Sequence, residues 1–61
     1  MTPQQKRAAP ILQKHYAHIL SGRTLTVDEI TAELRILRRR KAQGLLDDFS
    51  MRLYSAIFGT P

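Results

Sequence analysis

The absence of cysteine from a chain of 61 residues is the feature that most limits how this protein can fold. A chain this short buries only about 60% of the surface that its unfolded form exposes, so its core alone gives a marginal fold. Small domains commonly add disulfides, a structural metal or a second subunit. Disulfides and thiolate metal sites are excluded without cysteine. We therefore expect unusually good helix packing or self-association, and we favour a homodimer.

The first stretch of helical periodicity predicts a helix over about 10–21. Its apolar positions follow the spacing i, i+4, i+7 and i+8 and are Leu12, Tyr16, Ile19 and Leu20. We place Pro10 near the start of this helix, because proline lacks an N–H group and clashes with the preceding turn. Residues 1–9 are then expected to be frayed or to form a separate turn, although Thr2 and Gln5 have the spacing of a capping box. Ser21-Gly22 ends the helix.

The clearest local signal is a capping box formed by Thr26 and Glu29, which predicts a second helix over 27–41. Leu25 can pack against Ile30 across the cap, and the buried stripe continues with Leu34 and Leu37. Asp28 and Glu29 also suit the positive end of the helix dipole.

Apolar residues return at helical spacing over 45–58, which predicts a third helix. A break at about Gly44 is favoured, because the apolar stripe lapses between Leu37 and Leu45. One long bent helix is the alternative. The sequence therefore predicts a small all-α domain of two to three helices, over about 10–21, 27–41 and 45–58, that pairs into a homodimeric bundle.

A run of positive charge is the feature most informative about function. Its members are Arg35, Arg38, Arg39, Arg40 and Lys41. None of them has an acidic residue three or four positions away, which is the spacing that pairs charges on a helix. Arginine forks match phosphate oxygens, so the run is a candidate phosphate contact. Two other interpretations stay open: Asp47 and Asp48 neutralise the run, or the segment is simply solvated.

Residues 25–36 resemble the opening of a bacterial helix-turn-helix, in which a capped helix leads into the turn. The apolar positions of the motif are filled by Ile30, Leu34 and Ile36. The resemblance implies that Arg38, Arg39 and Arg40 begin a recognition helix whose first residues reach base edges. The pattern departs from the motif after Arg40, where the apolar residues fall one position late.

The net charge of +5 favours an anionic partner, either nucleic acid or an acidic protein surface. Our leading hypothesis is a small regulatory protein that binds nucleic acid through the basic run, with Lys14 and Arg23 as outlying contacts. Stacking of single-stranded bases is disfavoured, because the run contains no aromatic residue. The alternative is a protein-interaction module, an inhibitor, adaptor or assembly factor, that uses an apolar face of the last helix. The residues expected at that interface are Leu46, Phe49, Leu53, Ile57 and Phe58.

The remaining expectations are absences. His15 and His18 share one side of the first helix, but a zinc site generally needs at least three protein ligands. We expect no metal, no cofactor, no small-molecule substrate and no catalytic activity. No apolar run approaches the roughly 18 residues of a membrane span, and no secretory signal is apparent, so we expect a cytoplasmic protein without membrane contact.

Overall fold

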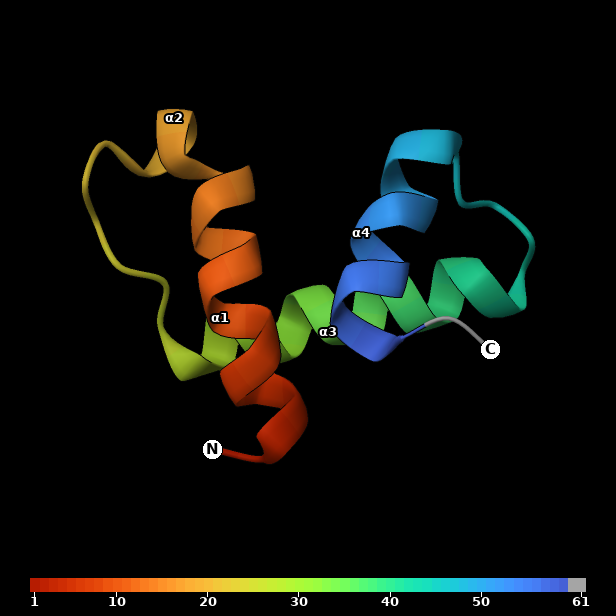
Figure 1. Cartoon of the computed structure of the whole chain (residues 1–61), viewed down its shortest axis with the longest axis horizontal. Coiled ribbons are helices and arrows are strands. Elements are labelled where there is room, and N and C mark those ends of the chain that lie inside the picture. The colour runs from red at the N-terminus through yellow and green to blue at the C-terminus, as the bar shows by residue number, and fades with distance from the viewer. Residues whose placement is uncertain (60–61) are drawn as a thin grey trace.

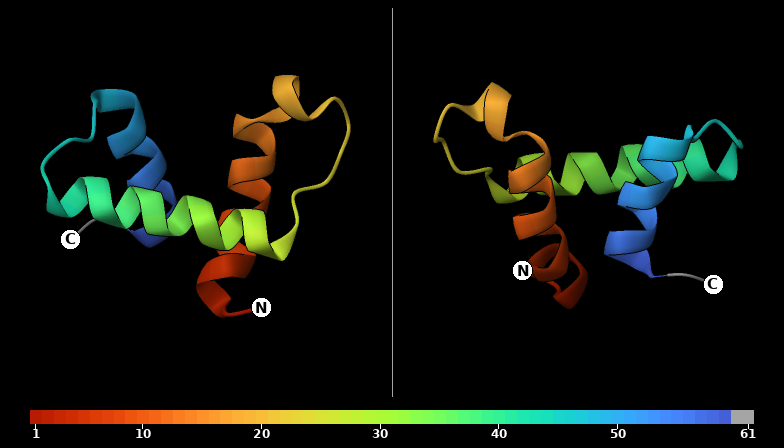
Figure 2. Two further views of the ribbon diagram at one scale, coloured as in Figure 1. Left: turned by 180° about the vertical axis from the view of Figure 1, so that it is seen from behind. Right: turned by 45° about the horizontal axis from the view of Figure 1, so that its top comes forward.

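The computed structural model describes residues 1–59, which form four helices and no strand. The helices are α1 (Pro3–His15), α2 (Ala17–Leu20), α3 (Val27–Ala42) and α4 (Asp48–Phe58). Helices α1 and α4 pack against one side of α3 and against each other, and they run in opposite directions (Figures 1 and 2). The all-α fold expected from the sequence is confirmed.

The core lies where α1 and α4 cross α3. Six side chains from these three helices form its buried cluster: Ala8, Leu12, Ile30, Leu34, Leu37 and Ile57. The three core residues of α3 follow the expected helical spacing. Partly buried apolar residues surround them, among them Leu25, which packs against this core cluster. A core of this size gives a fold of modest stability.

The first helix begins before the position predicted from the sequence. Thr2 caps α1: its Oγ1 accepts from the Gln5 amide at 3.1 Å, and its own amide donates to Gln5 Oε1 at 2.8 Å. Pro10 lies inside the helix, on its exposed side. The expectation of a frayed 1–9 segment is therefore wrong. Because Pro10 has no N–H group, the Lys6 carbonyl lacks its hydrogen-bond donor within the helix. Lys6 is exposed, so the loss affects a group at the surface, and the capped first turns persist.

The predicted helix over 10–21 is also divided in two. Tyr16 leaves helical geometry (φ −101°, ψ 12°) and separates α1 from α2. Its phenol donates to Glu33 Oε2 at 2.9 Å, which ties this corner to α3. Burial, followed by this hydrogen bond, raises the pKa of Tyr16. Gly22 takes a positive φ of 87° after α2, as expected, and Ser21 is left-handed as well, at 51°.

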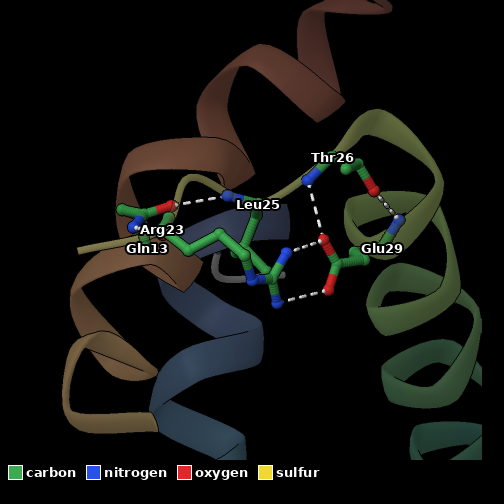
Figure 3. Close-up of polar contacts among 5 residues, drawn as sticks. All are labelled: Gln13, Arg23, Leu25, Thr26 and Glu29. Carbon is green, nitrogen blue, oxygen red and sulfur yellow. Dashed lines mark hydrogen bonds and ion pairs between the residues drawn. The ribbon is translucent and has the colours of Figure 1, made fainter. Parts of the chain in front are cut away.

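The cap of α3 is formed as predicted. Thr26 Oγ1 accepts from the Glu29 amide at 3.2 Å, and the Thr26 amide donates to Glu29 Oε1 at 2.9 Å (Figure 3). The loop before the cap is fastened to α1 by Gln13, which accepts from the Leu25 amide and donates to the Arg23 carbonyl. This arrangement fixes the angle at which the chain enters α3.

The break near Gly44 is confirmed, since α3 ends at Ala42 and Gly44 has a φ of 70°. The last helix is shorter than the predicted 45–58. It starts at Asp48 because Asp47 is its N-cap, accepting from the Ser50 amide at 2.7 Å. Leu45 and Leu46 therefore lie in the loop, and Leu45 is largely exposed. No helix within residues 1–59 combines the length and apolar character needed to cross a bilayer.

Candidate nucleic-acid interface

The basic run occupies the last turns of α3 without interruption. The helix-turn-helix resemblance implies a turn before Arg38, but α3 continues unbroken to Ala42. That expectation is wrong, and Arg38 does not begin a recognition helix. No glycine or proline stands between Thr26 and Gly44 to end the helix sooner.

The helix separates the five charges into groups. Arg35, Arg38 and Arg39 lie within an arc of about 100° on one side of α3, because they are three and four residues apart. We call these three side chains the basic flank. Arg40 projects from the opposite side, and Lys41 continues the buried stripe one turn after Leu37.

Arg38 is the member of the basic flank that is held in place. Its Nη2 donates to Gln4 Oε1 at 2.6 Å, and its guanidinium carbon lies 5.3 Å from the centroid of the Phe58 ring. Arg38 thus joins α3 to the start of α1 and to the end of α4. Arg35 and Arg39 make no side-chain hydrogen bond to residues 1–59 and extend into solvent.

Arg40 and Lys41 lie in different surroundings. The Lys41 ammonium is 6.0 Å from the centroid of the Tyr54 ring on α4. Arg40 is close to Asp47: the hydrogen bond from the Ser50 amide lowers the pKa of the Asp47 carboxyl, and the charge of Arg40 adds to this effect. The interpretation that an acidic residue neutralises the run therefore has support at Arg40, which nevertheless forms no ion pair with Asp47.

The basic flank lies beside the N-terminal end of α1, the end marked N in Figure 1. A surface hollow of about 470 Å³ lies at this junction, and its walls include Arg35, Arg38, Pro3 and Gln4. The first turn of α1 contains no acidic residue, whereas those of α3 and α4 do. Positive charge therefore meets the positive end of a helix dipole at this point.

Sequence reasoning did not identify Arg7 as part of this surface. Arg7 lines an adjoining hollow of about 260 Å³ with Gln4 and Phe58, the two residues that contact Arg38. Only the packing of α1 against α4 brings Arg7 near the basic flank, so no local pattern could have indicated it.

The counter-charge of the basic flank is absent from the described part of the chain. Within residues 1–59 the single ion pair joins Arg23 to Glu29, at 2.7 Å (Figure 3). Arg23, one of the two outlying candidates, is therefore already paired with a carboxylate at the α3 cap. The other outlying candidate, Lys14, is an α1 residue and lines a hollow between α1 and α4 that contains none of the flank arginines.

The five residues expected at a protein interface differ in how exposed they are. Ile57 is 1% exposed and belongs to the core, so it has no surface to offer a partner. Leu46, Leu53 and Phe58 are partly buried against that core, and Phe58 stacks on Tyr54. Phe49 is 63% exposed.

Phe49 borders a groove of about 450 Å³ between the C-terminal part of α1 and the N-terminal part of α4. We call this hollow the α1/α4 groove. Its lining residues are Ile11, Lys14, His15, Phe49, Arg52 and Leu53. The ring of His15 lies 5.0 Å from that of Phe49, which accounts for His15 as a packing residue. Residues 1–59 contain no group of three potential metal ligands, so His15 and His18 lack a third partner there.

Comparison of this chain with known protein families, with curated proteins and with solved structures gave no match.

Proposed function

We propose that this protein binds nucleic acid, with the basic flank (Arg35, Arg38 and Arg39) as its main contact. The observation that carries the proposal is that these arginines share one side of α3 and have no acidic partner within residues 1–59. Arg7 and the start of α1 enlarge the same positive surface.

An extended polyanion fits this surface better than a single small anion. Arg35 and Arg39 are about 6 Å apart along the helix axis, while duplex DNA carries a negative charge every 1.7 Å or so along its axis. A guanidinium group can bind two phosphate oxygens at once. Arg38 is already oriented by Gln4 and Phe58, so little side-chain freedom is lost when it binds.

The expected mode is contact with the phosphate backbone rather than reading of bases. Base edges are usually read by residues at the start of a helix in the major groove. The basic flank instead lies at the end of α3, and phosphate contacts of this kind give affinity without sequence information. We expect weak sequence preference and a strong dependence on salt.

The proposal is tested with the double variant R35Q/R39Q. These two side chains make no hydrogen bond within residues 1–59, so their replacement leaves the packing intact. Binding to a short fluorescent DNA duplex is measured by anisotropy between about 50 and 200 mM salt. Loss of two phosphate contacts should reduce the slope of log K against log salt by about 1.8.

The matched control is R40Q/K41Q, which removes the same charge from residues of α3 that lie outside both the basic flank and the α1/α4 groove. We expect its slope to stay within error of the parent's. Equal losses in both variants would reduce the effect to net charge and would contradict a specific contact surface. A parent protein that fails to bind duplex DNA or RNA at low salt would refute the proposal outright.

The protein-interaction alternative is supported by another surface, the α1/α4 groove with its exposed Phe49. An adaptor or inhibitor would place an apolar segment of its partner there. Recovery of a stoichiometric protein partner after nuclease treatment, lost in F49A and kept in R35Q/R39Q, would favour this alternative. We also propose that the functional unit is a homodimer, which would present the basic flank twice.

A further inference from the structure

The outer side of α4 carries an exposed stripe formed by Asp48, Phe49, Arg52 and Ala56. These residues follow the spacing i, i+1, i+4 and i+8, so they share one side of the helix. Phe49 is 63% exposed, so most of this apolar ring is open to a partner. The stripe borders the α1/α4 groove, to which Phe49 and Arg52 both belong.

The two charges on this stripe are opposite and one turn apart. Asp48 precedes Arg52 by four residues, the favourable order for an ion pair within a helix. This spacing favours an ion pair, but the structure does not form it, since the one ion pair among residues 1–59 is Arg23–Glu29. Both side chains are exposed and thus available to a second molecule.

A helix face with a negative charge followed by a positive charge can pair with an identical face on a second helix that runs in the opposite direction. In a twofold dimer the same surface meets itself, so a contact from one copy is repeated by the other. If two α4 helices pack antiparallel and centre near Ser50, Asp48 of each copy meets Arg52 of the other. Phe49 then lies at the middle of the contact, where it can enter the partner's α1/α4 groove.

We propose that the stripe and the α1/α4 groove form a homodimer interface, with the second copy's α4 antiparallel to the first. This inference does not depend on nucleic-acid binding. An acidic partner or a nucleic acid would satisfy Lys14 and Arg52 but would bring negative charge against Asp47 and Asp48. A second copy instead places Arg52 against Asp48 and Asp48 against Arg52, and it covers Phe49.

The decisive experiment is a charge reversal followed by measurement of molecular mass by sedimentation equilibrium. The parent should sediment at twice the 7.0 kDa chain mass and dissociate on dilution. D48R replaces two attractive contacts by two repulsive ones and should raise the dimer dissociation constant at least tenfold or so. Adding the second reversal, in D48R/R52D, restores complementary charges and should restore the dimer.

D28R is the matched control. Asp28 is also exposed in the first turn of a helix, so D28R has the same net charge as D48R and loses the same interaction with a helix dipole. It should remain dimeric. F49A provides an independent variant that keeps the charges, and it too should dissociate; circular dichroism of each variant verifies the fold.

Several results would overturn the inference. A parent that is monomeric at high protein concentration would do so, as would D48R dimerising as tightly as D28R. A folded D48R/R52D that stays monomeric would exclude the antiparallel register. If F49A remains dimeric, the second copy binds elsewhere, and the α1/α4 groove is left for a different protein.

Discussion

Replacing Pro10 with alanine tests where α1 begins. In a helix interior proline is about 3 kcal/mol less favourable than alanine, because it removes one backbone hydrogen bond and clashes with the preceding turn. Pro10 lies inside α1, so P10A restores a donor for the Lys6 carbonyl. The proline also restricts the unfolded chain, which offsets about 0.4–1 kcal/mol of the gain. We expect P10A to stabilise the protein by roughly 2 kcal/mol.

Thermal unfolding followed by circular dichroism measures this effect. A change of 1 kcal/mol shifts the unfolding temperature of such a small domain by about 4–8 °C, so P10A should raise it by roughly 8–16 °C. P3A is the matched control: Pro3 is the first residue of α1, where proline is favoured, so P3A should be neutral or slightly destabilising. If P10A behaves like P3A, Pro10 marks a helix start and the continuous α1 described above is refuted.

Two further predictions concern the core and the α3 cap. L12A removes most of a fully buried side chain and should lower the free energy of unfolding by about 2–5 kcal/mol, out of roughly 3–9 kcal/mol for a chain of this length. The control I19A changes an exposed site and should lower it by no more than about 0.5 kcal/mol. Equal shifts of the two variants in urea denaturation would contradict the assignment of Leu12 to the core. Hydrogen bonds from Arg23, then from the Thr26 amide, lower the pKa of Glu29 from 4.5 to about 2. This stabilisation is complete above pH 4.5 and disappears as the pH falls through about 2, so acid should destabilise the parent more than E29Q, and equal acid sensitivity would count against it.

Local signals were sufficient for some elements and insufficient for others. The α3 cap was predictable because Thr26 and Glu29 satisfy each other's backbone donors within one turn. The Gly44 break was predictable because the apolar stripe lapses there. The start of α1 could not be predicted from the proline penalty at Pro10 alone, because the burial of Ala8 and Leu12 on the other side of the helix favours a continuous α1.

The sequence could not predict which basic residues would lie together on the surface, and the reason is different. A sequence shows that Arg38 and Lys41 are near in number, but it does not show that one contacts Phe58 and the other Tyr54. The same holds for Arg7, which reaches this region only through the packing of α1 on α4. These contacts form only where three helices meet, so they belong to the tertiary structure. Helical periodicity in the sequence does not predict them.

The two proposed surfaces can be separated experimentally because they use different residues of different helices. The basic flank lies on α3 near the start of α1, whereas the stripe lies on the outer side of α4 and borders the groove near the end of α1. R35Q/R39Q should thus weaken nucleic-acid binding and leave the molecular mass unchanged. D48R adds positive charge, which by itself strengthens attraction to phosphate. Loss of nucleic-acid affinity in D48R, despite that added charge, would therefore mean that binding needs two copies of the basic flank on one duplex.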